Sequence, residues 1–155
     1  MDLVLRAASL DDATIVYETI MLAFEDYRHK LDPPSSVFLE TVDSIHGKLE
    51  KGGGFIAFLD GKIVGSVLYH QQDNYMYLGR LCVLPEFRGN GVARILVEAV
   101  ENRARELNLA SVQLAARVAL TGNHAMFKHF GYEILAECRH EGYAETTYYE
   151  FHKLL

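Results

Sequence analysis

The hydrophobic pattern of the chain changes its period sharply near residue 85. The apolar run from Leu81 to Leu84 predicts a strand, and Pro85 ends it because proline has no N–H for a sheet ladder. Beyond this point apolar residues recur every three or four positions, as on one face of a helix: Val92, Ile95, Leu96, Ala99, Val100, Ala104 and Leu107. The pattern therefore predicts a strand, a tight loop with two glycines, and a helix over 91–108.

The rest of the chain divides into further strands and helices. Strands are predicted at 3–6, 55–59, 62–69, 75–84, 109–117, from 131 through 135, and at 146–154. Helices are predicted from a Ser9 cap to near Arg28, from a Ser35 or Ser36 cap through Leu49, and over 121–130. Asp60-Gly61 predicts a hairpin, 71–74 a second turn, and 52–54 a flexible glycine connector.

These elements predict an α/β (α+β) fold with a single domain over residues 1–155. Strands joined by short turns pair antiparallel, whereas the helix over 91–108 supplies the crossover that a parallel pair needs. Two helices before the central strands and two after them can cover both faces of the sheet. We expect a mixed, mostly antiparallel central sheet of about seven strands with helices on both faces.

Composition narrows the classes of partner. The chain has 155 residues, half of them apolar, and its net charge of −6 at pH 7 provides no basic footprint for nucleic acid. No apolar run reaches the ~20 residues of a membrane helix, and residues 1–6 lack the features of a signal peptide. Cys82 and Cys138 fall on predicted strands, where we expect small buried thiols rather than a disulfide. A cytoplasmic protein without nucleic-acid or membrane partners is the consistent prediction.

The glycine loop before the central helix has a chemistry of its own. The first N–H groups of a helix have no partner inside it and lie at the positive end of the helix dipole. Gly89 and Gly91 carry no side chain, so a ligand can approach this backbone closely. The arrangement suits a phosphate or pyrophosphate, and it equally suits an ordinary strand-to-helix turn. It is neither a P-loop nor the dinucleotide fingerprint, because no Gly-Lys-Ser/Thr and no third glycine follow.

A family resemblance favours a phosphate-binding role for this loop over an ordinary turn. Arg88-x-x-Gly91-x-Ala93 resembles the R/Q-x-x-G-x-G/A motif of the GCN5-related N-acetyltransferase (GNAT) superfamily, and Leu81-x-Val83-x-Pro85-x-Phe87 is similar to that family's preceding strand and turn. The resemblance implies a GNAT fold that binds acetyl-CoA, with its pyrophosphate on the loop amides and its pantetheine arm along the strand. The acetyl-CoA-binding residues that it implies are Leu81, Cys82, Val83, Arg88, Gly89, Asn90, Gly91, Val92, Ala93, Arg94, Asn123 and Phe127.

The resemblance also implies a catalytic apparatus, from which this chain departs at two positions. The backbone amide of Val83 would polarise the thioester carbonyl, a role that needs no particular side chain. Tyr77 lies about where many relatives carry a glutamate base, and a neutral tyrosine is a poor base. Tyr77 can act through water or can simply pack on the sheet, and His70 is another candidate base.

The proton donor to the leaving thiolate is the second departure. The stretch 123–132 resembles the family's N-x-x-x-Y-x-x-x-G-F, but Phe127 stands where the tyrosine often protonates the thiolate. Phe127 can still line the CoA channel, and water can supply the proton. Tyr132, Tyr143 or Tyr148 could replace the missing hydroxyl. Asn123 either bonds the CoA arm or caps the short helix.

Candidate acceptor residues follow from the same resemblance, because the first two helices and the loop before the last strand border the family's acceptor site. They are Tyr27, Arg28 and Tyr143, followed by Glu25, Asp26, Asp32, Arg139 and His140; an ordinary polar loop is the alternative for each. No metal is predicted, because His124 and His129 are five residues apart and no Cys/His set has ligand spacing.

The sequence therefore predicts an acetyl-CoA-dependent N-acetyltransferase that transfers acetyl to a primary amine by direct attack in a ternary complex. A small or amino-acid-like amine is the favoured acceptor, and a peptide is possible. A homodimer is plausible by family analogy. The alternative is an acyl-CoA-binding regulatory module with little catalysis, which the absent glutamate and the tyrosine-to-phenylalanine change at Phe127 would suit.

Overall fold

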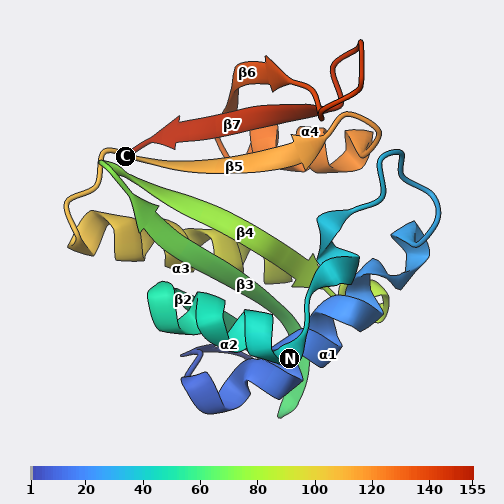
Figure 1. The fold of residues 1–155 in the computed structure, drawn as a ribbon. Helices are drawn as coiled ribbons and strands as arrows, with labels where there is room; N and C mark the ends of the chain where they lie inside the picture. Colours follow the sequence, from blue (N-terminus) through green and yellow to red (C-terminus); the bar gives the residue numbers. More distant parts are fainter. Residues whose placement is uncertain (1) are drawn as a thin grey trace.

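A single mixed sheet organises the computed structural model, which describes residues 2–155 (Figure 1). Its seven strands lie in the order β1-β2-β3-β4-β5-β7-β6. Only the β4–β5 pair is parallel; the other neighbours are antiparallel. The strands are β1 (Leu3–Ala7), β2 (Gly53–Leu59), β3 (Lys62–Gln72), β4 (Tyr75–Val83), β5 (Ser111–Arg117), β6 (Glu133–Cys138) and β7 (Tyr148–Leu154). The predicted fold class is confirmed.

Helices cover both faces of the sheet. They are α1 (Ala13–Phe24), α2 (Val42–Lys51), α3 (Val92–Glu106) and α4 (Thr121–His129), with short 3₁₀ turns η1 (Leu10–Asp12), η2 (Glu25–Tyr27), η3 (Ser36–Leu39) and η4 (Pro85–Phe87). Helices α1 and α2 share one buried apolar cluster with Ile56, Leu68 and Cys82 of the sheet. Helix α3 packs on the opposite face in a second cluster, which Phe127 of α4 joins (Figure 1).

The second predicted helix is wrong as one continuous element. Ser35 accepts a hydrogen bond from the Val37 N–H and caps only η3, after which the chain is extended at Glu40. A new helix, α2, then begins behind Thr41, whose hydroxyl accepts from the Ser44 N–H. Two local caps within seven residues therefore divide a stretch whose apolar spacing is compatible with one helix.

Several other boundaries also differ from the prediction. Gly53 and Gly54 are not a flexible connector but the first residues of β2, paired with Tyr69 and Leu68 of β3. A Cβ atom on Gly52 would lie 2.0 Å from the carbonyl oxygen of Tyr69, so the glycines permit close backbone approach. Strand β3 continues to Gln72, β6 to Cys138, β5 begins at Ser111, and β7 begins at Tyr148. Cys82 is buried as expected, whereas Cys138 is half-buried; both are free thiols.

The two halves of the sheet are joined by a very short ladder. Strands β4 and β5 pair only from Tyr75 to Tyr77, opposite 111–113, and then diverge (Figure 1). The crossover helix α3 lies across this junction. Its buried Glu101 accepts a 2.8 Å hydrogen bond from the Tyr132 hydroxyl and pairs with Lys153 at 3.2 Å. This contact ties α3 to the β5–β7–β6 half of the sheet.

Substituting Tyr132→Phe should destabilise the protein by about 1.5–3 kcal/mol, because it removes a buried hydrogen bond to a carboxylate. Urea unfolding of wild type and variant measures this difference. Tyr149→Phe is the matched control, since within residues 2–155 the Tyr149 hydroxyl makes no hydrogen bond, and it should cost under ~0.5 kcal/mol. Equal losses in the two variants would contradict this role for Tyr132.

Candidate active site

The open edge of β4 is the first component of the site. Leu84 donates its N–H to the carbonyl oxygen of Val64 in β3 at 2.8 Å. Val83 precedes it and lies opposite Gly65, so its backbone N–H and C=O point away from β3, toward the side where β5 has diverged. The Val83 N–H is therefore directed into the opening between β4 and β5.

The N-terminus of α3 is the second component. Gly91 is its N-cap residue with φ of 80°, and Gly89 has φ of 82°, both in the left-handed region where glycine is favoured. No side chain caps this helix and no acidic residue lies in its first turn. The N–H groups at the start of α3 thus keep their positive partial charge for another partner, which makes this end a ready anion site.

Arg88 of the predicted motif braces the loop. Its Nε donates to the carbonyl oxygen of Val83 and its Nη2 to that of Ala23, each at 3.1 Å. The side chain thus connects the end of β4, the loop and the last turn of α1. Asn90 similarly bonds its own loop, with Nδ2 3.1 Å from the carbonyl oxygen of Phe87. These contacts indicate that the two side chains shape the loop while its backbone faces the opening.

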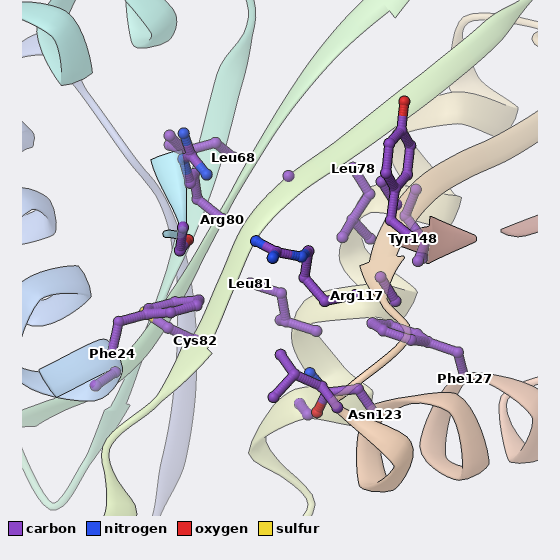
Figure 2. A pocket seen from close by; sticks show the side chains of 18 of the residues that line it. Phe24, Leu68, Leu78, Arg80, Leu81, Cys82, Arg117, Asn123, Phe127 and Tyr148 are labelled. Atoms are coloured by element: carbon purple, nitrogen blue, oxygen red, sulfur yellow. The ribbon is translucent and has the colours of Figure 1, made fainter. Parts of the chain in front are cut away.

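One large cavity of about 1480 Å³ joins both components. It contains every predicted acetyl-CoA-binding residue except Asn90 in its lining. Figure 2 shows Leu81 from β4, with Asn123 and Phe127 from α4, around one part of this space. Asn123 does not cap α4, because the N-cap residue is Leu120. Phe127 is 5% exposed and packs near Phe151, which makes it an apolar wall of the cavity.

His70 and Tyr77 form a stacked pair at the cavity wall. They are cross-strand partners on β3 and β4, with ring centroids 5.1 Å apart and planes at 30°. Burial raises the pKa of Tyr77, so its hydroxyl stays protonated at neutral pH. Burial and the nearby Lys48 lower the pKa of His70, which favours the neutral imidazole. Of the two predicted candidates, His70 has the better protonation state for a base.

The three tyrosines proposed to replace the missing hydroxyl lie in different places. Tyr132 is committed to Glu101 in the core, and Tyr143 donates to the carboxylate of Asp32; neither lines the cavity. Tyr148, on β7, does line it (Figure 2). Burial, and to a lesser extent the neighbouring Cys138, raises the pKa of Tyr148, so its hydroxyl keeps its proton.

Comparison with known proteins agrees with this geometry. The sequence model of the Acetyltransferase (GNAT) family matches residues 15–132, well over half of the chain. The chain belongs to the acetyltransferase (GNAT) family. It therefore carries an acetyltransferase domain of the GNAT type, as the loop motif predicted.

Individual GNAT relatives are distant. N-acetylaspartate synthetase of Rattus norvegicus is 31% identical over 88 residues, which are 56% of this chain and 29% of that protein. The chain thus matches less than a third of the length of this relative. The uncharacterized N-acetyltransferase YjcF of Bacillus subtilis is 32% identical over 91 residues, 58% of this chain and 63% of that one. The PaiA N-acetyltransferase of Thermoplasma acidophilum, solved in complex with coenzyme A, superposes with a TM-score of 0.85 over 100% of both chains at 13% identity.

The candidate acceptor residues divide between cavity and surface. Tyr27 lines the cavity, as do Arg139 and His140, whereas Arg28 and Tyr143 do not. The Arg28 guanidinium pairs with Glu25 at 3.0 Å and lies 4.3 Å above the Phe38 ring. Arg28 thus makes a local ion pair and a cation–π contact outside the cavity lining, and its contact with a substrate stays a prediction.

Four basic residues of the lining were not predicted from the sequence: Lys48, Lys51, Arg80 and Arg117. Arg80 lies at an irregularity of the β3–β4 register with φ of 50°, a conformation that its sequence context does not signal. Its Nε contacts the buried carboxylate of Glu40 at 2.8 Å, and Lys48 pairs with the same carboxylate. Burial opposes ionisation of Glu40, but bonds from Lys48, Ser44 and Arg80 hold its pKa below the usual value.

Among residues 2–155, no group of three or more His, Cys, Asp and Glu side chains is arranged to hold a metal ion. Over the same residues, no helix has both the length and the apolar character needed to cross a membrane.

Substituting Gly91→Glu should weaken binding of coenzyme A by at least about 100-fold, because a carboxylate at the start of α3 would repel an anion there. Calorimetric titration with coenzyme A measures this loss. Gly61→Glu is the control: Gly61 also has a positive φ, 82°, with open space at its Cβ position, but it lies in the β2–β3 turn. Retained affinity in Gly91→Glu, or equal loss in both variants, would contradict an anion site at α3.

Proposed function

We propose that the protein is an N-acetyltransferase that transfers acetyl from acetyl-CoA to the primary amine of a small, amino-acid-like acceptor. One observation carries the proposal: the opening between β4 and β5 places a free strand edge and an uncapped helix N-terminus in one continuous cavity. The strand edge suits an extended amide-containing chain, and the helix end suits a pyrophosphate. Acetyl-CoA has both groups.

The residues present fit acetyl-CoA in size and chemistry. The first-turn amides of α3 would hold the pyrophosphate, and the open backbone of Leu81 and Val83 would hold the pantetheine arm, with Asn123 and Phe127 alongside. Bound acetyl-CoA supplies an acetyl group activated as a thioester. The cavity volume of about 1480 Å³ exceeds the ~300–1,000 Å³ of an ordinary small-molecule pocket, so a second substrate has room.

Direct attack by the amine is favoured over a covalent acetyl-enzyme. Cys82 is the cysteine of the cavity lining, but its thiol is buried and contacts the Ser66 hydroxyl at 3.4 Å. Burial raises the pKa of Cys82, so the thiol is not ionised at neutral pH and is a weak nucleophile. The Val83 N–H would instead polarise the thioester carbonyl for attack by the bound amine.

His70 and Tyr148 are the proposed proton carriers. His70 would take the proton of the acceptor ammonium at Nε2, which the side-chain amide of Gln72 contacts at 2.7 Å. The exposed Gln72 amide can turn to present its oxygen once the ring is protonated. Tyr148, protonated and on the cavity wall, would give a proton to the departing sulfur. Tyr77 then serves to position the His70 ring by stacking.

A relative and the composition of the site support an amino-acid-like acceptor. The name of the 31% identical N-acetylaspartate synthetase indicates that its product is an acetylated amino acid. Besides β4 and the start of α3, the cavity lining includes residues of the loop at 31–36, of β3 and of the β6–β7 loop. An acceptor held there would have its amine between His70 and the open edge of β4.

An assay of acetyl-CoA with a set of amino acids, polyamines and short peptides tests the proposed transfer. Release of CoA thiol from acetyl-CoA should accelerate with amino acids and not with polyamines or short peptides, and mass spectrometry should find the acetylated amine. If protein that binds acetyl-CoA releases no more CoA thiol with any of these amines than without them, the result would contradict the proposal and favour the alternative, an acyl-CoA-binding module with little catalysis.

Substituting His70→Gln should lower kcat by about 10²–10⁴-fold with little change in the KM for acetyl-CoA. Because its pKa lies below the ordinary 6.5, the wild-type imidazole remains a base at pH 6.5 and loses this role only on further acidification. The residual kcat of the His70→Gln variant should not show this fall as the pH is lowered. His46→Gln, at an exposed position of α2, is the control. An unchanged kcat in His70→Gln would exclude His70 as the base.

A further inference from the structure

The lining of the cavity is basic although the chain is acidic. The whole chain has a net charge of −6. The cavity lining contains one acidic residue, Glu141. Seven of its residues are cationic: Lys48, Lys51, Arg80, Arg88, Arg94, Arg117 and Arg139. Such a concentration of one sign in a cleft attracts ligands of the opposite sign.

The cations near α3 either hold the loop in place or lie close to where the pyrophosphate of acetyl-CoA would bind. Arg88 is bonded to two backbone carbonyl groups, and Arg94 lies over the Phe130 ring and 3.8 Å from Glu98. At the other end, Lys48 and Arg80 share the buried carboxylate of Glu40. Two cations on one carboxylate leave a net positive charge on that wall.

Arg117 differs from these four cations, and also from Lys51 and Arg139, whose side chains are exposed. It is the last residue of β5, half-buried, and within residues 2–155 no carboxylate lies within ion-pair distance of its guanidinium. Within residues 2–155, the guanidinium makes one hydrogen bond, from Nη2 to the carbonyl oxygen of Pro33 at 2.5 Å. Figure 2 shows the side chain extending from β5 across the cavity toward β4. A guanidinium has five N–H donors, so this one keeps donors for a ligand.

The surroundings fix Arg117 at the acceptor end. Pro33, which it bonds, belongs to the loop between α1 and η3, and Tyr148, its cross-strand partner on β7, also lines the cavity. The same loop is held to the β6–β7 loop by the bond from the Tyr143 hydroxyl to Asp32. The guanidinium is thereby pre-positioned between two walls, which reduces the entropy that a bound anion would have to remove.

We propose that Arg117 binds a carboxylate of the acceptor, so that acceptors that carry this carboxylate are preferred to the corresponding amides and to simple amines. The inference rests on the proposed function for the identity of the reaction, but the carboxylate site stands on the geometry of Arg117. The planar guanidinium matches a carboxylate through two parallel N–H donors, which an ammonium cannot reproduce. Lys48 and Arg80 add to the positive potential on the facing wall.

The test compares L-aspartate with its two monoamides, asparagine and isoasparagine, in wild type, Arg117→Gln and Arg117→Lys. Acetyl transfer is measured as CoA release, and binding by calorimetry to protein saturated with coenzyme A. Wild type should prefer the diacid to at least one monoamide by about 10- to 100-fold. Arg117→Gln should lose this preference through a higher acceptor KM, with unchanged affinity for coenzyme A, and Arg117→Lys should keep part of it. Arg105→Gln, on the exposed face of α3, is the control.

The outcomes separate the two proposals. Equal use of acid and amides by wild type, or a preference that survives in Arg117→Gln, would overturn the carboxylate site while leaving acetyl transfer intact. Binding of aspartate that depends on Arg117, without transfer to any amine, would uphold the carboxylate site and refute the proposed function. Neither binding nor turnover of these acids by wild type would overturn the carboxylate site.

Discussion

The divergence of β4 from β5 after three residue pairs is the constraint on which the rest of the structure depends. A continuous sheet would satisfy the backbone of 78–83 with hydrogen bonds from β5. The separation instead leaves alternate N–H and C=O groups of β4 directed into a cavity, where an extended ligand can replace the missing strand. The binding surface is therefore made largely of backbone, and many side-chain substitutions can leave it intact.

The separated halves need other connections, and the structure supplies them on both faces. Helix α3 connects β4 to β5 as the crossover of a parallel pair, which directs its N-terminus to the same end of the opening as Val83. Glu101 of α3 fixes the distal half through Tyr132 and Lys153. On the near half, Arg88 joins the loop to Val83 and to the end of α1. Stability and site geometry thus rest on the same few contacts.

The sequence predicted the parts of this arrangement that are local. The loop of Gly89 and Gly91, the apolar stripe of α3 and the hairpin at Asp60-Gly61 each depend on neighbouring residues, and they lie where the pattern placed them. The break between η3 and α2 was missed because caps at Ser35 and Thr41 compete with an apolar spacing that fits one helix.

The rest of the site depends on contacts between distant segments. Tyr132, Tyr143 and Tyr148 were indistinguishable in sequence, and only their partners in space assign one to the core, one to a loop contact and one to the cavity. Arg117 gave no signal of its own because its position follows from Pro33, 84 residues away. Arg28, conversely, was a candidate substrate contact, but its guanidinium pairs with Glu25 and does not line the cavity.

The most direct measurement of the central claim is a titration of ¹⁵N-labelled protein with coenzyme A, followed through backbone amide shifts. The account predicts saturable shifts at the amide of Val83 and at the first-turn amides of α3. The amide of Leu84, already bonded to Val64, should change much less. Saturable binding that shifts other amides and leaves Val83 and the start of α3 unchanged would contradict the claim that the open strand edge and this helix end bind the donor.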